Sequence, residues 1–267
     1  MKRKRIVQLS IEVIIIIVIA VLAFIQFKSR KHDLPQILES GRLYVLTDSS
    51  SLGFCKSGGK VGGFQYEIIK AFADTLGVEL VITEESDYEK CIALLKNREY
   101  DIIASLIPIT NEKKTDLQFT MPLQWSRLML VQALETDSGF KHHSNVLDLG
   151  GDTLVVNIHS PHKYRIAHLS DEIAQPIYVK EVSGKSEEQL VQQLSMRKIG
   201  RTICDEKSAT VFKRKYPNID VSLPIGFSQP MGWATHQDSY LLMKELNDFL
   251  DDFIGSSAYW EIYRKYY

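Results

Sequence analysis

Cysteine is scarce in this sequence, with only Cys55, Cys91 and Cys204 among 267 residues. So few cysteines exclude a mini-protein held together by disulfides. A hydrophobic content of 45% excludes a disordered chain and is enough for sizeable cores. Both the Gly-x-Ser-x-Gly nucleophile elbow and the His-Glu-x-x-His zinc motif are absent from the sequence. The composition therefore indicates a globular protein without these common catalytic signatures.

A surplus of positive charge is also missing from most of the chain. Residues 1–31 carry a net charge of +6, whereas the remaining 236 residues carry −7. Nucleic acids require a basic surface that neutralises their phosphates. The acidic body therefore predicts no nucleic-acid partner, and its size leaves room for one large domain or two lobes.

One long hydrophobic run is present, at the N-terminus. Four basic residues precede an apolar stretch at 6–27, which as a helix would be about 33 Å long at about 1.5 Å per residue. We expect residues 1–5 to form a cytoplasmic tail, 6–27 a single-pass inner-membrane anchor and 28–35 a linker, with the body in the periplasm. A cleavable signal peptide is the alternative, because residues 21–23 offer a small-residue cleavage site.

The body alternates short apolar runs with helical patterns, which is typical of βαβ units around a mainly parallel sheet. Strands are expected at 43–47, 78–82, 101–106, 153–157, 177–179, 202–204 and 219–223. Helices are expected at 66–76, 88–96, 160–169, from 186 onward and over the tail 240–267. A capping box at Ser186 to Gln189 supports the fourth helix, and the glycine pairs at 58–59 and 62–63 predict a hairpin tip.

Polar or backbone-exposing residues follow several of these strands. Ligands collect beyond the carboxyl ends of strands in such sheets, which draws attention to Asp48, the stretch 105–108, Ser160 and Asp205. Ser160 followed by Pro161 is a good helix start, whose free amides and positive dipole end suit a carboxylate or phosphate. Each position also fits an ordinary helix cap or surface turn.

Four segments, taken in order, resemble family 3 of the periplasmic solute-binding proteins, the amino-acid-binding type. They are Leu46-Thr47-Asp48 with Phe54, Gly63-Phe64-Gln65-Tyr66-Glu67, Ile109-Thr110-Asn111-Glu112-Lys113 with Phe119-Thr120-x-Pro122, and Asp205-Glu206 with the closing helices. The likeness covers residues 36–267. Within the superfamily, residues 64–80 are most similar to the N-terminal sensor module of membrane-bound lytic transglycosylase F. The chain is expected to lack the catalytic muramidase domain that follows this module there.

The resemblance implies a two-lobe α/β fold of the type II periplasmic-binding-protein kind. Lobe 1 would comprise 36–129 and 230–267, lobe 2 would comprise 130–229, and two crossing strands would join them around a small ligand. The ligand-binding residues that the resemblance implies are Asp48, Ser51, Tyr88, Ser105, Ile107, Pro108, Lys113, Ser160 and Asp205. One disulfide, between Cys55 and Cys91 of the same lobe, stays open as an alternative to free thiols.

Several of these positions have a specific implied role. Tyr88 stands where the family stacks an aromatic ring on its ligand, and Asp205 where a carboxylate receives the α-ammonium. Lys113 takes the place of an arginine that grips the α-carboxylate, but a lysine cannot form the planar two-bond fork of arginine. Because of this departure, the pocket has other interpretations besides a site for a free amino acid. It could bind a peptide or a cell-wall fragment, or it could be a degenerate pocket.

The sequence as a whole predicts a non-enzymatic binding or sensor module for a small amino-acid-like, peptide or muropeptide ligand. Neither a cofactor nor a metal is expected, because His159 and His162 straddle a helix start and no further ligand completes a set. A membrane transporter or a cell-wall enzyme is the expected partner. The alternatives are a lyase or dehydratase on the same scaffold, with Asp205 or Glu206 as general acid, and a cell-wall-enzyme-related module lacking its catalytic domain.

Overall fold

The structure, a computed structural model, describes residues 32–57, 59–134 and 141–267. The tail and anchor expected at 1–5 and 6–27 lie outside the described residues. Within the described part of the chain, no helix combines the length and the apolar character needed to cross a bilayer. Residues 33–267 form one compact unit, and the architecture below is that of this unit.

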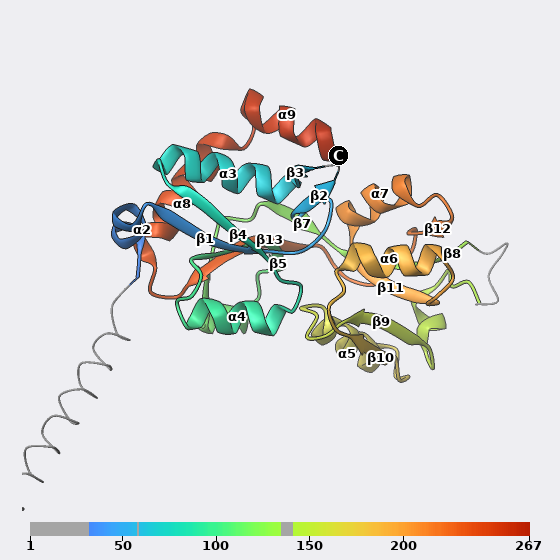
Figure 1. The fold of residues 1–267 in the computed structure, drawn as a ribbon. Coiled ribbons are helices and arrows are strands. Elements are labelled where there is room, and N and C mark those ends of the chain that lie inside the picture. The colour runs from blue at the N-terminus through green and yellow to red at the C-terminus, as the bar shows by residue number, and fades with distance from the viewer. Residues whose placement is uncertain (1–31, 58, 135–140) are drawn as a thin grey trace, which may run out of the picture. The chain divides into compact units, whose positions relative to one another are not determined.

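The first lobe is built on a six-stranded sheet (Figure 1). Its strands are β1 (Arg42–Thr47), β4 (Glu79–Glu84), β5 (Ile102–Pro108), β6 (Leu117–Phe119), β7 (Gln124–Ser126) and β13 (Gln229–His236). The order is β4-β1-β5-β13-β6, and β7 also pairs with β13. Strands β1, β4 and β5 are parallel, whereas β13 is antiparallel to each of its neighbours. The carboxyl ends of β1 and β5 therefore meet at one edge of the sheet.

Helices cover both faces of this sheet (Figure 1). They are α2 (Leu34–Ser40), α3 (Phe64–Leu76), α4 (Tyr88–Lys96), α8 (Tyr240–Phe253) and α9 (Ser257–Tyr266), with a short 3-10 turn η1 (Lys113–Thr115). Apolar residues of α3 recur at helical spacing and are buried in one core with α2, α8 and α9. On the opposite face, Cys91 and Leu95 of α4 pack against Ile103 and Ala234. The sheet is thus buried on both sides, as parallel strands require.

A small hairpin stands between β1 and α3. Its strands β2 (Cys55–Ser57) and β3 (Lys60–Gly62) are antiparallel, which confirms the hairpin predicted from the glycine pairs. Gly63 then adopts a φ of 141°, and a Cβ there would lie 2.1 Å from the carbonyl oxygen of Gly53. Only glycine fits this position, and it allows the chain to turn directly into α3.

The second lobe contains a three-stranded sheet and a separate strand pair (Figure 1). The sheet has the order β11 (Arg201–Asp205), β8 (Leu128–Ala133) and β12 (Ile219–Asp220), and the pair is β9 (Thr153–Asn157) with β10 (Tyr178–Val182). Its helices are α5 (Lys163–Glu172), α6 (Glu187–Ser195) and α7 (Glu206–Lys215), with a 3-10 turn η2 (Val146–Leu149). Both faces of β8 are buried, because Leu130 and Val131 belong to two different hydrophobic clusters.

The expectation of a mainly parallel sheet is correct only in part. The β1, β4 and β5 group and the β9 and β10 pair are parallel, but β8 is antiparallel to both β11 and β12. The reason is the way the chain passes between the lobes. It leaves the first sheet at β7, enters the second directly as β8, and returns as β13 against the direction of β5.

One helix prediction needs correction. The helix expected to open at Ser160 begins at Lys163 instead, because residues 158–162 form turns around His159, whose φ is 54°. The helical tail expected over 240–267 is confirmed and consists of two helices. The chain breaks after α8 at Gly255, whose φ of 92° does not suit a right-handed helix, and α9 starts afresh with Ser256 as its cap. The capping box at Ser186 is also confirmed.

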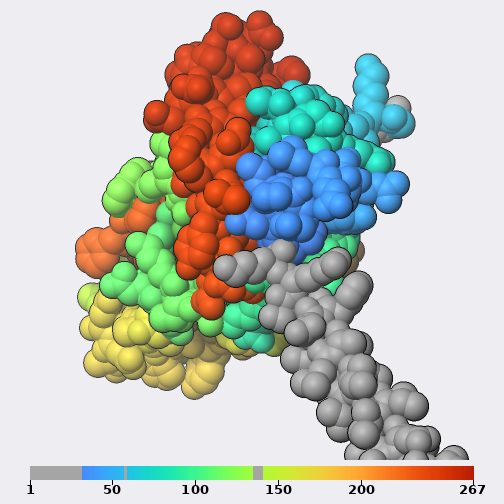
Figure 2. Space-filling view, turned by 90° about the vertical axis from the view of Figure 1, so that its left-hand side faces the viewer, coloured from blue at the N-terminus to red at the C-terminus, as the bar shows by residue number. Residues whose placement is uncertain are grey.

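The C-terminal residues contact both lobes. Tyr266 and Tyr267 pack against the core of the first lobe, where Phe64 lies among their rings. Arg214 of α7, in the second lobe, donates hydrogen bonds to the carbonyl oxygens of Tyr267 at 2.5 Å and Tyr266 at 3.3 Å. Figure 2 shows the C-terminal segment, in red, lying along the blue residues of α2 and β1.

Candidate functional site

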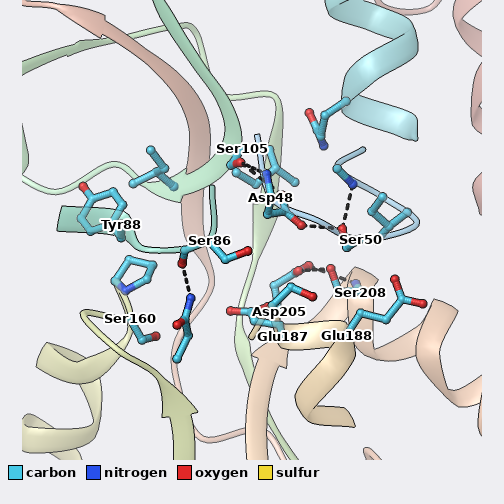
Figure 3. Close-up of a pocket in the computed structure, with 18 of the residues that line it drawn as sticks. Asp48, Ser50, Ser86, Tyr88, Ser105, Ser160, Glu187, Glu188, Asp205 and Ser208 are labelled. Carbon is cyan, nitrogen blue, oxygen red and sulfur yellow. Dashed lines mark hydrogen bonds between the residues drawn. The ribbon is translucent and has the colours of Figure 1, made fainter. Parts of the chain in front are cut away.

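A cavity of about 130 Å³ lies between the two lobes. Figure 3 shows Asp48, Ser50 and Ser105 of the first lobe on one side, facing Glu187 and Asp205 of the second lobe. The loop after β1, the strand β5 and the start of α4 supply the first side. The turn after β9 and the first turns of α6 and α7 supply the second.

The structure brings most of the predicted ligand-binding residues to this cavity. Six of the nine line it: Asp48, Tyr88, Ser105, Ile107, Ser160 and Asp205. Ser51, Pro108 and Lys113 do not belong to its lining. The rule that ligands collect at the carboxyl ends of strands accounts for Asp48 after β1, whereas Ser105 lies in the middle of β5. Ligand binding by these residues remains a prediction.

Asp48 is held by the hydroxyl groups around it. Ser50 Oγ donates to Asp48 Oδ2 at 2.5 Å, and Ser105 Oγ lies 3.2 Å from Oδ1. Burial raises the pKa of the Asp48 carboxyl, the two serine hydrogen bonds oppose that rise, and the nearby charge of Glu188 adds to it. The carboxyl group is therefore positioned before any ligand arrives, and its charged form is costly there.

Glu187 faces Asp48 from the other lobe. Its Oε1 lies 3.2 Å from Nε2 of the buried His162, and a third of its side-chain surface, 33%, remains accessible where it lines the cavity. Burial raises the pKa of Glu187, the hydrogen bond from His162 opposes this, and the charges of Asp205 and Asp48 raise the pKa further. The sequence analysis missed this residue. The sequence did contain a signal for it. Acidic residues are favoured in the first turn of a helix, because they complement the positive end of the helix dipole, and Glu187 directly follows the predicted cap Ser186.

Glu188, the next residue, joins the lobes. Its Oε2 accepts a hydrogen bond from the backbone N–H of Ser51 at 2.6 Å, and its Oε1 pairs with Lys215 of α7. Glu188 is buried, so this contact is shielded from water. The predicted residue Ser51 thus takes part in the site through its backbone rather than by lining the cavity.

Two further contacts cross between the lobes at the opposite end of the cavity. The side-chain amide of Asn157, the last residue of β9, donates to the carbonyl oxygen of Ser86. His159 Nδ1 lies 3.0 Å from Asp87 Oδ1, and its Nε2 lies 3.3 Å from Glu89 Oε2. Together with the Ser51–Glu188 bond, these contacts, hereafter the interlobe contacts, hold the two lobes closed around the cavity.

Tyr88 and Lys113 form a separate pair. The Lys113 Nζ lies 5.0 Å from the centre of the Tyr88 ring, a cation–π distance. Burial lowers the pKa of Lys113 to about 8 and raises the pKa of Tyr88. The Tyr88 hydroxyl is buried without a hydrogen-bond partner. Tyr88 therefore lines the cavity with its ring, its hydroxyl points away from Asp48 and Glu187 (Figure 3), and Lys113 contacts the ring from outside the cavity lining.

Ser160 does not head a helix as the sequence predicted. Its Oγ accepts from the backbone N–H of His162 at 3.3 Å, and its carbonyl oxygen accepts from Lys163 at 3.2 Å. The N–H of Ser160 itself donates to Asn157 at 3.1 Å. The amides expected to receive an anion are thus already used within the turn.

Asp205 is the N-cap of α7. Its Oδ1 accepts from the backbone N–H groups of Lys207 at 3.0 Å and Ser208 at 3.2 Å, and its Oδ2 accepts from the hydroxyl of Ser208. Ser126 Oγ and Gln124 Nε2 of β7 also donate to Oδ1, at 3.1 and 3.3 Å. Its side chain therefore has a clear structural role at the junction of β7, β11 and α7.

The described residues show no arrangement of three or more His, Cys, Asp or Glu side chains suited to a metal ion. The three cysteines are all free thiols, Cys91 and Cys204 being buried.

Comparison with known protein families shows which family the chain belongs to. The profile of the bacterial extracellular solute-binding proteins, family 3, matches residues 42–267. The chain belongs to this family. The resemblance drawn from the sequence motifs is thereby confirmed, and so is the prediction of a binding module rather than an enzyme for the matched residues.

Curated relatives of this family 3 protein include two named membrane-bound lytic murein transglycosylase F. The one from Desulfosudis oleivorans is 26% identical over 254 residues, covering 93% of this chain and 54% of the relative. The one from Cellvibrio japonicus is 23% identical and covers 83% of this chain and 44% of the relative. The chain thus spans about half the length of the curated relatives it matches.

Solved structures share the fold. An ancestral arginine-binding protein bound to arginine superimposes with a TM-score of 0.72 at 22% identity, covering 85% of this chain and 98% of that one. An amino acid ABC transporter substrate-binding protein from Streptococcus pneumoniae, bound to L-arginine, gives a TM-score of 0.71 at 19% identity, covering 86% and 96%. At these identities the likeness establishes the two-lobe fold of the family 3 protein and nothing finer.

Proposed function

We propose that this family 3 protein is an extracytoplasmic binding or sensor module that closes on a small amino-acid-like, peptide or muropeptide ligand. The observation that carries the proposal is the cavity between the lobes, lined by polar groups from both. A ligand there would touch Asp48 and Ser105 on one side and Ser160 and Glu187 on the other. Such a ligand would stabilise the closed arrangement over any open one.

A ligand screen tests the proposal. The full chain, purified in a mild detergent, is heated with amino acids, short peptides and muropeptides while its melting temperature is recorded. A ligand at about 100 times its dissociation constant stabilises the folded state by about 2.7 kcal/mol. We expect at least one class to raise the melting temperature and to lower the radius of gyration in X-ray scattering. A screen in which no class does either would refute the proposal.

A matched pair of variants locates the binding to the cavity. Tyr88→Leu removes the aromatic ring that lines the cavity and keeps an apolar side chain. We expect it to weaken binding of the ligand that the screen identifies. Tyr178→Leu, on an exposed strand of the second lobe, is the control and should leave binding unchanged. Thermal melting without ligand checks that both variants fold. Equal binding by all three proteins would remove the Tyr88 ring from the site.

We also propose that residues 6–27 anchor the protein in the inner membrane with its body in the periplasm, and that it acts with a transporter or a cell-wall enzyme. The basic and apolar pattern of the N-terminus supports the anchor, and the family description and the names of the relatives support an extracytoplasmic body. Deleting residues 1–31 should move the protein from the membrane to the soluble fraction. Equal membrane association of both forms would refute the anchor.

A further inference from the structure

The cavity between the lobes is unusually one-sided in charge. Five carboxylic side chains line it, together with one histidine: Asp48, Glu85, Glu187, Glu188, Asp205 and His162. Among the described residues that line it there is no lysine or arginine. Lys90 and Lys215 pair with Glu85 and Glu188 from outside the lining. Asp48, Glu187 and Asp205 have no lysine or arginine partner among the described residues. Glu187 faces His162 Nε2 at 3.2 Å, and Asp205 is satisfied by the hydrogen bonds of its helix cap.

Asp48 and Glu187, the two acids of the cavity that neither pair with a lysine or arginine nor cap a helix, belong to opposite lobes. Asp48 follows β1 in the first lobe, and Glu187 opens α6 in the second. Closure brings them to the same cavity, where burial and the charges of neighbouring carboxylates raise the pKa of both groups. Two facing carboxylates that are partly withdrawn from water oppose closure unless a positive charge or a proton comes between them.

A second observation also indicates a hydrogen-bond donor as the missing group. Asn157 lines the cavity, is only 8% exposed, and gives its amide N–H to the carbonyl oxygen of Ser86. That bond fixes which end of the amide is nitrogen, so the remaining atom, Oδ1, is an acceptor. It is buried and has no hydrogen-bond partner. A buried acceptor without a donor destabilises the folded state, and a ligand N–H at this point would satisfy it.

The groups expected to receive a carboxylate are not available. Lys113 contacts the Tyr88 ring and does not line the cavity. The backbone N–H groups of Ser160, His162 and Lys163 are bonded within their own turn. A ligand carboxylate would therefore meet buried acids and no compensating cation, an arrangement that strongly disfavours it.

We propose that this cavity takes a small organic cation, an ammonium or guanidinium compound that carries no carboxylate, whose N–H groups bridge Asp48 and Glu187 and reach Asn157 Oδ1. The inference rests on the proposed function, in that it assumes that the cavity holds a small ligand at all. The volume of about 130 Å³ limits the size, since a cavity of roughly 150 Å³ accommodates benzene. A short diamine fits both the size and the charge.

Calorimetric titration of the full chain at 150 mM salt tests the ligand class. The two probes are 1,4-diaminobutane and 4-aminobutyrate, which are nearly equal in length and differ in having an ammonium or a carboxylate at one end. The second pair, 1,5-diaminopentane and L-lysine, makes the same comparison with an α-amino acid. We expect each diamine to bind at least tenfold more tightly than its carboxylate-bearing counterpart.

Substitutions then test which carboxylate binds the cation. Glu187→Gln keeps the size of the side chain and removes its charge, and we expect diamine binding to weaken about 10- to 100-fold, the usual range for a hydrogen bond to a charged group. Glu172→Gln alters an exposed carboxylate of the same lobe that pairs with Arg165, and it should leave binding unchanged. Thermal melting without ligand checks that each variant folds. If Glu187→Gln does not fold, Asp48→Asn takes its place.

The outcomes separate this inference from the proposed function. Tighter binding of 4-aminobutyrate or L-lysine than of the diamines would overturn the inference while leaving a ligand-binding module in place. Binding of the diamines that is equal in Glu187→Gln and Glu172→Gln would also overturn it, because the cation would then lie elsewhere on the acidic surface. If neither these probes nor the ligand screen gives any binding, both proposals fail.

Discussion

Replacing Asp205 by alanine separates its structural role from the ligand role that the sequence predicted. A residue that only receives a ligand ammonium could be removed without harm to the unliganded protein. The structure indicates the opposite, because the Asp205 carboxylate caps α7 and accepts hydrogen bonds from Ser126 and Gln124 of β7. All three side chains are buried. We therefore expect Asp205→Ala to destabilise the protein even when no ligand is present.

The magnitude follows from the bonds that are lost. Loss of an N-cap side chain costs about 1 kcal/mol. The Ser126 hydroxyl and the Gln124 amide would each be left buried without this acceptor, at about 1–3 kcal/mol apiece. Because the adjoining cavity can admit water, the lower end applies to both. The expected loss is about 3 kcal/mol, which at a urea dependence of about 3 kcal/mol per molar is a midpoint about 1 M lower.

Urea unfolding followed by far-ultraviolet circular dichroism measures this loss. Asp205→Asn is the matched control, because its side-chain oxygen can still accept from Lys207 and Ser208 and cap the helix. We expect the asparagine variant to lose less than half as much as the alanine variant. A midpoint for Asp205→Ala within about 0.2 M of the wild type would refute the capping argument.

Three further expectations concern closure and the thiols. His159→Asn keeps a residue that tolerates the positive φ of 54° but removes the imidazole from its carboxylate partners. We expect the lobes to separate more readily, so the radius of gyration measured by X-ray scattering should increase. An unchanged radius would show that this contact does not hold the lobes together. Burial raises the pKa of Glu187 on closure, so the closed form binds more protons and becomes less stable as pH rises from about 4 through this raised pKa. The wild type without ligand should therefore be more compact at pH 5 than at pH 8, and a larger radius at pH 5 would contradict the sign. Burial raises the pKa of Cys91 to about 12 and that of Cys204 well above its usual range, so iodoacetamide should label Cys55 first and the other two only after unfolding; early labelling of either would place it nearer the surface.

Local sequence signals predicted much of the fold. The helix α4 and the strand β9 have the bounds expected from periodicity, and the capping box at Ser186 opens α6 as predicted. The failures lie where tertiary contacts override a local signal. Ser160 and Pro161 form a good helix start, yet the turn around His159 uses their backbone groups first. The antiparallel course of β8 depends on how the chain passes between lobes, which no local pattern encodes.

The candidate site was predictable as a region but not in its balance of charge. The strand-end rule and the family resemblance placed six residues on the lining of one cavity, from segments more than a hundred residues apart. They did not reveal that Lys113 contacts the ring of Tyr88, outside the cavity lining, or that Glu187 and Glu188 face the first lobe. Such facts depend on side-chain direction across the lobe junction, and a single sequence carries little information about that.

The position of the last residues has a practical consequence for engineering. Arg214 of the second lobe holds the carbonyl oxygens of Tyr266 and Tyr267, while their rings pack in the core of the first lobe. A fluorophore or fused domain attached at Tyr267 would therefore lie at the junction of the two lobes. If ligand binding changes the distance between the lobes, as the proposed function requires, a fluorophore there would report the change and a bulky domain would hinder closure.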